Sequence, residues 1–139
     1  MDTPAPDRAQ IAKLLRAHEI IPTHQRLVIA QILFARSQHL SADQLLTLVN
    51  QEHAEVSKAT IYNTLNLFEK KQMVREVIVD PERVFYDTNT QPHPHFFDVE
   101  QGILMDIEAP DLRLEGLPPI PEGMEQERMD VIIRIRKSH

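Results

Sequence analysis

Apolar residues recur at helical spacing in four successive stretches of the first half of the chain. A period of three to four residues gathers such side chains on one helix face. Thr23, Ser41 and Ser57 each precede one of the last three stretches, and hydroxyl side chains are favourable helix N-caps. We therefore expect helices over residues 7–18, over residues 23–35, after Ser41, and after Ser57, the last with Ile61, Leu65 and Phe68 facing inward.

After residue 72 the pattern changes to short runs of β-branched and aromatic residues. Residues 73–79 and 83–87 are two such runs, and the turn-forming residues 80–82 join them. Such an arrangement predicts a β-hairpin. Four short helices followed by a two-stranded hairpin outline a winged helix-turn-helix, in which His39 would lie in the loop before the third helix.

The second half of the chain is predicted to be mainly β. Residues 95–99 and 103–107 form a hairpin pattern, whereas residues 109–123 hold four Pro and two Gly and predict an irregular segment with at most one helical turn. Residues 128–136 alternate clearly between polar and apolar positions and predict a strand. This strand is expected to mediate dimerisation, because small three-stranded sheets seldom bury themselves unaided. The apolar face consists of Met129, Val131, Ile133 and Ile135.

The sequence Gln-Pro-His-Pro at residues 91–94 predicts a stiff junction and is a candidate domain boundary. The expected fold class is α+β. A winged helix-turn-helix domain would occupy residues 1–90, and a small α/β, mainly β, metal-sensing and dimerisation domain would occupy residues 91–139.

Composition and charge narrow the function. No stretch approaches the roughly 18 apolar residues of a transmembrane helix, and the N-terminus lacks the basic and apolar regions of a signal peptide. We therefore expect a cytoplasmic protein with no membrane partner. Because the chain has no Cys, any metal must be held by His and carboxylates.

The net charge of −6 is unevenly distributed. Residues 1–79 hold nine Lys and Arg against eight Asp and Glu, a balance of +1, and residues 80–139 hold six against thirteen, a balance of −7. The first part can still present a locally basic face, and the acidic second part suits metal cations better than phosphates.

The start of the fourth predicted helix carries residues suited to binding double-stranded DNA. Ser57, Lys58 and Thr60 can donate to phosphates at a helix N-terminus. One turn further on, Tyr62 can contact thymine methyl groups and Asn63 can read adenine. The alternative is that the hydroxyls only cap the helix and Tyr62 only packs.

Two arginines extend this predicted DNA interface. Arg26 lies near the start of the second helix, where its guanidinium can clamp a phosphate. Arg83 lies at the tip of the predicted wing, where the narrow minor groove of A·T-rich DNA would attract it.

Five residues form a candidate metal site. His93 and His95 project to the same side if the intervening Pro94 keeps the chain extended. Asp87 and Asp106 could supply oxygen ligands, and His39 a third imidazole. Mixed nitrogen and oxygen ligands suit Fe(II), Mn(II) or Zn(II). The alternative is that the His-Pro-His sequence is a solvated surface loop.

Several short motifs, in order and at matching spacing, resemble the ferric uptake regulator family over roughly residues 8–108. The sequence also looks closest to the iron response regulator branch, through its Tyr-Asp-Thr-Asn-Thr run and its C-terminal Val-Ile-Ile-Arg-Ile-Arg. The motifs are residues 23–26 (Thr-His-Gln-Arg), 39–43 (His-Leu-Ser-Ala-Asp), 57–65 (Ser-Lys-Ala-Thr-Ile-Tyr-Asn-Thr-Leu), 85–90 (Phe-Tyr-Asp-Thr-Asn-Thr) and the His-x-His pair.

The resemblance implies an iron-responsive regulator, either a repressor or an activator, that binds palindromic A/T-rich operators as a homodimer. It also implies one divalent metal per subunit in a regulatory site that bridges the two domains. The ligands at the matching positions would be His39, Asp87, His93, His95 and Asp106. The fourth predicted helix of each subunit would be the recognition helix, which enters the DNA groove. Metal occupancy would then set the spacing of the two recognition helices in the dimer and thereby the DNA affinity.

The sequence departs from the family pattern at three places. Asp98 and Gln101 stand where paired Cys usually hold a structural zinc, so that zinc site is expected to be absent. Pro92 and Pro94 stand at ligand positions of a further site found in some members, which is also expected to be lost. Asn63 replaces the Arg that is more frequent in the recognition helix, which affects the expected target sequence.

Other functions remain as alternatives. A regulator of the same family could sense peroxide through oxidation of a metal-bound His, or could sense haem through His ligands. From a different class, a mononuclear metalloenzyme could use a His and Asp site with open positions. A metalloenzyme would leave the helix-turn-helix pattern unexplained. The sequence therefore favours a regulator over an enzyme.

Overall fold

A computed structural model of the chain describes residues 4–52, 56–108 and 111–139. Its contacts divide the chain into two compact units, residues 1–91 and 92–139. Among the described residues, the first unit holds all four helices and one sheet, and the second unit holds a second sheet.

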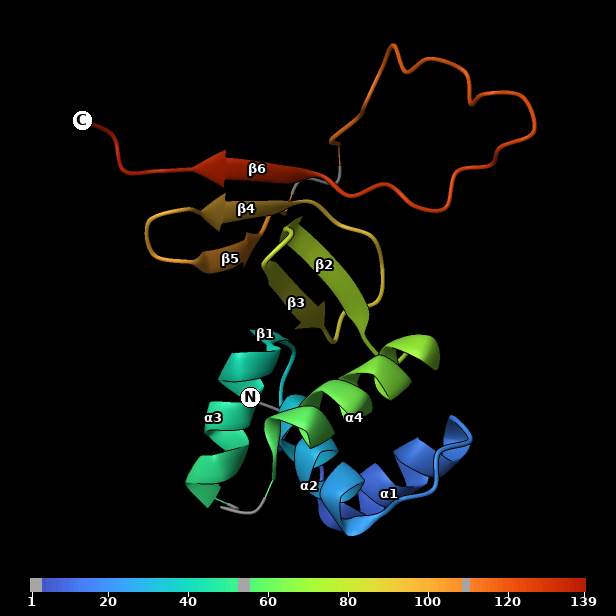
Figure 1. Cartoon of the computed structure of the whole chain (residues 1–139), viewed down its shortest axis with the longest axis vertical. Coiled ribbons are helices and arrows are strands. Elements are labelled where there is room, and N and C mark those ends of the chain that lie inside the picture. Colours follow the sequence, from blue (N-terminus) through green and yellow to red (C-terminus); the bar gives the residue numbers. More distant parts are fainter. Residues whose placement is uncertain (1–3, 53–55, 109–110) are drawn as a thin grey trace. The chain divides into compact units, whose positions relative to one another are not determined.

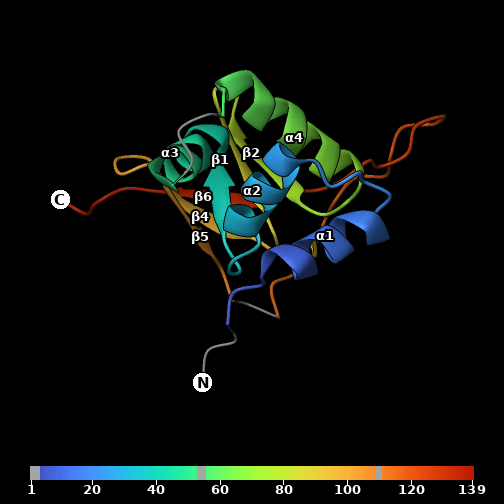
Figure 2. The ribbon, with the colours of Figure 1, turned by 90° about the horizontal axis from the view of Figure 1, so that it is seen from below.

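The four predicted helices are confirmed in the first unit (Figure 1). In Figure 2, α2 lies between α1 and α3, and α4 packs against both α2 and α3. The bounds are Arg8–Ala17 for α1, His24–Leu33 for α2, Ala42–Glu52 for α3 and Lys58–Lys70 for α4.

Polar side chains cap the helix starts at the predicted positions. The Thr23 hydroxyl accepts the N–H of Arg26, and the Ser57 hydroxyl accepts the N–H of Thr60. Ser41 and Gln44 form a reciprocal pair, in which the Ser41 hydroxyl and the Gln44 side-chain oxygen each accept the other's backbone N–H. These bonds satisfy amide groups that a helix N-terminus leaves without intrahelical partners.

The apolar stripes of the helices meet in a single core in the first unit. The predicted inward-facing residues of α4, Ile61, Leu65 and Phe68, are all buried. The Phe68 ring also contacts the Phe34 ring, with 5.9 Å between their centroids. Burial of these side chains fixes which face of α4 remains exposed.

The sheet of the first unit has three strands in the order β1-β3-β2. The predicted hairpin is β2 (Arg75–Asp80) and β3 (Arg83–Asp87), and β1 (His39–Ser41) pairs antiparallel with β3. The prediction of a two-stranded wing with His39 in a loop was therefore wrong. Three residues are too short a run to show strand alternation, and only their pairing with β3 makes them a strand.

The second unit contains a three-stranded sheet in the order β5-β4-β6. The predicted hairpin is β4 (His95–Asp98) and β5 (Ile103–Asp106), which turns through Gly102 at a positive φ of 70°. Strand β6 (Ile132–Ile135) is shorter than predicted and pairs parallel with β4. Residues 111–131 contain neither helix nor strand and form the wide loop of Figure 1.

The two faces of this second sheet differ in chemistry. Phe97, Leu104 and His95 are buried on one face. On the other face, Phe96 pairs with Met105 and with Ile133, so these three side chains form a row across the strands. Met105 is 38% exposed and Ile133 is 42% exposed. The row presents apolar surface to solvent.

Within the part of the chain that the structure describes, no helix is long and apolar enough to cross a bilayer. The longest helix among the described residues, α4, has 13 residues.

Candidate metal centre and nucleic-acid interface

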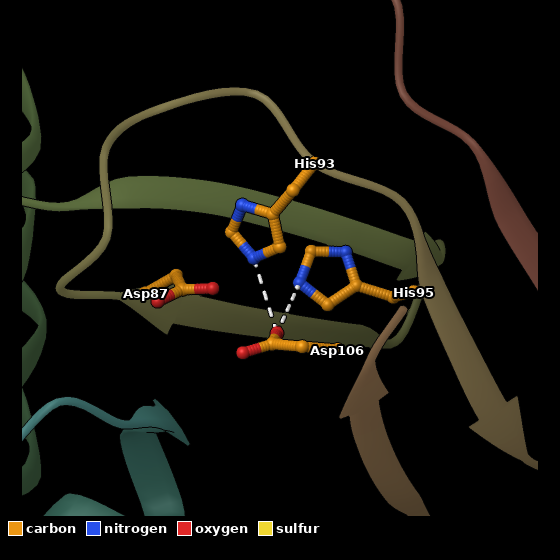
Figure 3. A group of neighbouring side chains, drawn as sticks. All are labelled: Asp87, His93, His95 and Asp106. Atoms are coloured by element: carbon orange, nitrogen blue, oxygen red, sulfur yellow. Dashed lines mark hydrogen bonds and ion pairs between the residues drawn. The ribbon is translucent and has the colours of Figure 1, made fainter. Parts of the chain in front are cut away.

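Three predicted metal ligands converge in the second unit. The Nε2 atoms of His93 and His95 lie 3.1 Å and 3.2 Å from the same oxygen of Asp106, Oδ1. The two imidazole rings are 4.3 Å apart between centroids. Figure 3 shows both rings turned toward the Asp106 carboxylate.

The backbone of β4 and β5 produces this convergence. His95 and Asp106 are directly opposite in the antiparallel pair, so their side chains lie on the same face. His93 precedes His95 by two residues in an extended segment and projects to the same side, as the sequence predicted. Around Pro94, the N–H of Ile107 donates to the Pro94 carbonyl and the N–H of His95 donates to the Val131 carbonyl. These bonds hold the segment between the two imidazoles in place.

The chemistry of this group fits a divalent cation. Each of the three residues offers one ligand atom within 4.8 Å of the others. His95 is nearly fully buried, and Asp106 is half exposed. Two imidazole nitrogens and a carboxylate oxygen are ligands that Fe(II), Mn(II) and Zn(II) accept.

The other two predicted ligands, His39 and Asp87, lie together in the first unit. His39 in β1 is directly opposite Asp87 in β3, which places both side chains on one face of that sheet. Asp87 is 2% exposed and its Oδ1 accepts the N–H of Asn89. The His39 ring contacts the Phe85 ring edge to face, with 6.3 Å between centroids.

The predicted DNA-contacting residues of α4 divide between two faces of that helix. Lys58 and Tyr62 share one face, where the Lys58 ammonium lies 5.9 Å from the centre of the Tyr62 ring. Lys58 also forms an ion pair with Asp43 of α3, with 3.2 Å between Nζ and Oδ1. The Asp43 carboxylate raises the pKa of Lys58 above its usual value. Tyr62 is 40% exposed, so it is available to a partner.

Thr60 and Asn63 lie on the other face of α4, beside the start of α2. With Arg26 and Thr23 they line a hollow of about 530 Å³. The Arg26 guanidinium donates to the Ile21 carbonyl, which holds it at this position. Hydroxyl, amide and guanidinium groups around one hollow can donate hydrogen bonds to phosphate oxygens and base edges.

Ser57 and Arg83 occupy the positions that the sequence assigned them. The Ser57 hydroxyl is the N-cap of α4, which is the structural role left open by the sequence. Arg83 is the first residue of β3, and its Nε atom lies 3.9 Å from Asp80 Oδ2 across the hairpin turn.

Sequence reasoning missed Asp43 as a member of this surface. Its position in the first turn of α3 is typical of an acid that stabilises a helix N-terminus. Only the packing of α3 against α4 brings it to Lys58. No sequence signal connects two residues that are fifteen positions apart in different helices.

Comparisons with known proteins agree with the resemblance to the ferric uptake regulator family. A model of the ferric uptake regulator family matches residues 17–131. The peroxide-responsive repressor PerR of Staphylococcus aureus is 31% identical over 98 residues, which are 70% of this chain and 66% of that protein. The matched region therefore spans slightly less than two thirds of that relative.

Solved structures support the fold. The ferric uptake regulator of Vibrio cholerae aligns with a TM-score of 0.71 at 18% identity, over 91% of this chain and 98% of that chain. The ferric uptake regulator of Pseudomonas aeruginosa, solved with manganese, aligns with a TM-score of 0.66 at 19% identity, over 93% and 98%. Members of this family are metal-responsive regulators and not enzymes. By its family match and its fold, this chain belongs to the ferric uptake regulator family.

Proposed function

We propose that this chain is a metal-responsive transcriptional regulator that binds palindromic A/T-rich operators in the cytoplasm as a homodimer. The observation that carries the proposal is the convergence of His93 and His95 on a single oxygen of Asp106. Three potential ligands with their donor atoms turned to one point fit a binding site better than a solvated loop. Fe(II) is the favoured metal, with Mn(II) and Zn(II) as alternatives.

The proposed complete site adds His39 and Asp87. These two residues face each other across β1 and β3, and Asp87 is only six positions before His93 in the chain. Six residues of extended chain span at most about 20 Å, so the junction allows both groups to serve one ion. A cation held by residues of both units would restrict their arrangement and so link metal occupancy to DNA affinity.

The proposed DNA surface is centred on α4. Lys58, Thr60, Tyr62 and Asn63 are distributed over its two exposed faces, and Ser57 fixes where the helix begins. Arg26 and Arg83 would contact the backbone or the minor groove on either side. The burial of Ile61, Leu65 and Phe68 leaves the polar faces of the helix for this purpose.

The proposed dimer would form through the sheet of the second unit. The apolar row of Phe96, Met105 and Ile133 faces solvent, and β6 is at the edge of the sheet. Exposed apolar rows and sheet edges are common in protein interfaces. A second copy of the chain, packed on this row, would place two DNA-binding units on one molecule.

A pair of substitutions tests the proposal. With His93→Ala and His95→Ala combined, we expect Mn(II) to lose its effect on the anisotropy of a labelled operator duplex. His18→Ala is the matched control, because this imidazole contacts only the Leu14 carbonyl among the bonds described and lies in the other unit. An unchanged response to Mn(II) in the double variant would contradict the assignment of the site.

Peroxide sensing is a second candidate function. The Staphylococcus aureus relative is a peroxide-responsive repressor, and both carboxylates of the proposed site are Asp. Oxidation of a ligand imidazole would add one oxygen atom to His39 or His93. Peptide mass spectrometry after loading with Fe(II) in air would detect that addition, and its absence would favour a sensor of metal alone.

A further inference from the structure

Lys58 is bracketed by two groups that hold its ammonium near the start of α4. The Asp43 carboxylate is 3.2 Å from Nζ, and the Tyr62 ring centre is 5.9 Å from it. The side chains of Lys58 and Asp43 are 59% and 71% exposed. The pair therefore lies in solvent on the same surface as Tyr62.

The ion pair offsets an unfavourable placement. A cation in the first turn of a helix meets the positive end of the helix dipole, whereas an anion in the first turn of its own helix is favoured. Lys58 begins α4 and Asp43 is in the first turn of α3. Asp43 thus interacts favourably with the dipole of α3 and also supplies the counter-charge for Lys58.

We propose that Asp43 sets the DNA affinity of this chain by competing with a DNA phosphate for the Lys58 ammonium. The inference rests on the proposed function, because it assigns a role within the same DNA surface. A solvent-exposed ion pair is weak and is screened by salt, so a phosphate can displace the carboxylate. The displaced carboxylate then remains beside the DNA backbone as a like charge.

This competition has a measurable signature in salt dependence. Each phosphate that a protein cation neutralises contributes a slope of about −0.9 to the plot of log affinity against log salt concentration. While the Asp43 carboxylate competes with the phosphate for the Lys58 ammonium, that lysine contributes only part of this slope. Removing the carboxylate should therefore increase both the affinity and the steepness of the plot.

The test is a double-mutant cycle on the full chain loaded with Mn(II). The proteins are the wild type, Asp43→Asn, Lys58→Met and the double variant, and the probe is a fluorescein-labelled mixed-sequence DNA duplex. We expect Asp43→Asn to bind about two- to fivefold more tightly at low salt, with a slope steeper by up to about 0.9. In the Lys58→Met background the same substitution should leave the slope unchanged and give a smaller gain in affinity, because only the repulsion between the carboxylate and the DNA backbone is then removed.

Two further variants separate competition from other roles of Asp43. Asp43→Glu keeps the carboxylate and should restore wild-type affinity and slope. Glu52→Gln makes the same change of charge at the far end of α3 and should leave the slope unchanged. Urea unfolding of each variant measures any contribution of Asp43 to the stability of α3, which would not alter the salt slope.

Three results would overturn the proposal. An equal gain in the Lys58→Met background would show that Asp43 acts only as a general negative charge. A loss of affinity in Asp43→Asn would show that the carboxylate orients Lys58 for binding. Failure of the wild type and all variants to bind duplex DNA at low salt would overturn the proposed function itself, which distinguishes it from failure of this inference.

Discussion

His95 of β4 lies directly opposite Asp106 of β5, and the Nε2 atom of His95 is 3.2 Å from Asp106 Oδ1. The register of one hairpin therefore fixes both side chains on one face. Because side chains alternate along a strand, a slip of one residue would send them to opposite faces. This hairpin, together with the extended segment that carries His93, organises three of the proposed ligands within the second unit.

Asp106→Asn is expected to weaken Mn(II) binding by at least tenfold. The amide keeps the size of the side chain but loses the negative charge, and even changes outside the ligand set of a metal site cost about 10–100-fold in affinity. Isothermal titration calorimetry would measure the dissociation constant. Asp98→Asn is the control, because Asp98 lies on the same hairpin and accepts the N–H groups of the turn. Equal affinities for Asp106→Asn and the wild type would exclude Asp106 as a ligand.

Two substitutions of Ser57 are expected to separate stability from DNA binding. Ser57→Ala removes the hydroxyl that accepts the Thr60 N–H and should lower the free energy of unfolding by about 1 kcal/mol in urea titrations. Ser57→Asp preserves a capping acceptor and should keep that stability, yet it should weaken DNA binding through repulsion of phosphates. If Ser57→Asp bound DNA as tightly as the wild type, Ser57 would lie outside the DNA surface.

Tyr86 should make the stability of the protein fall at alkaline pH. Burial raises the pKa of Tyr86 above its ordinary value near 10, and the Glu76 carboxylate adds to the effect. The folded state therefore binds the phenolic proton more tightly than the unfolded chain does. The resulting contribution is fully present below about pH 10 and is lost as the pH rises through the raised pKa.

Urea unfolding between about pH 9 and about pH 11 would measure this loss. Tyr86→Phe should reduce the fall in stability over that range, whereas Tyr62→Phe, which removes the chain's other tyrosine and a smaller cause of the raised pKa than burial or Glu76, should retain most of it. Identical pH profiles for Tyr86→Phe and the wild type would show that Tyr86 does not cause the fall.

Ile133→Lys is expected to convert the proposed dimer to a monomer. Ile133 lies in the exposed apolar row of the second sheet, and a buried ammonium at an interface would lack a partner. Light scattering after size-exclusion chromatography should report half the wild-type mass. Ile78→Lys is the control, since Ile78 is 52% exposed on β2 in the first unit. A dimeric Ile133→Lys variant would place the interface elsewhere.

The helices could be predicted from the sequence because their signals are local. Thr23 and Ser57 mark where α2 and α4 begin, and the spacing of Ile61, Leu65 and Phe68 fixes the buried face of α4. The relation of His93 to His95 is equally local, because it depends only on an extended chain through Pro94.

Pairings between distant segments could not be predicted in the same way. The strand character of His39 depends on β3, which is more than forty positions later in the chain. Likewise, the ion pair between Lys58 and Asp43 depends on how α3 packs against α4. In both cases the contact joins two distant segments, and the residues around each partner contain no pattern that predicts the contact.

DNA anisotropy under Mn(II) titration, compared between the wild type and His39→Ala, would show whether a metal ion bound by both units controls DNA affinity. His39 belongs to the first unit, whereas His93, His95 and Asp106 belong to the second. We predict that His39→Ala still binds Mn(II), more weakly, but that saturating Mn(II) no longer increases its affinity for the operator duplex. If Mn(II) raised the DNA affinity of His39→Ala as much as that of the wild type, metal binding across the two units could not be the switch.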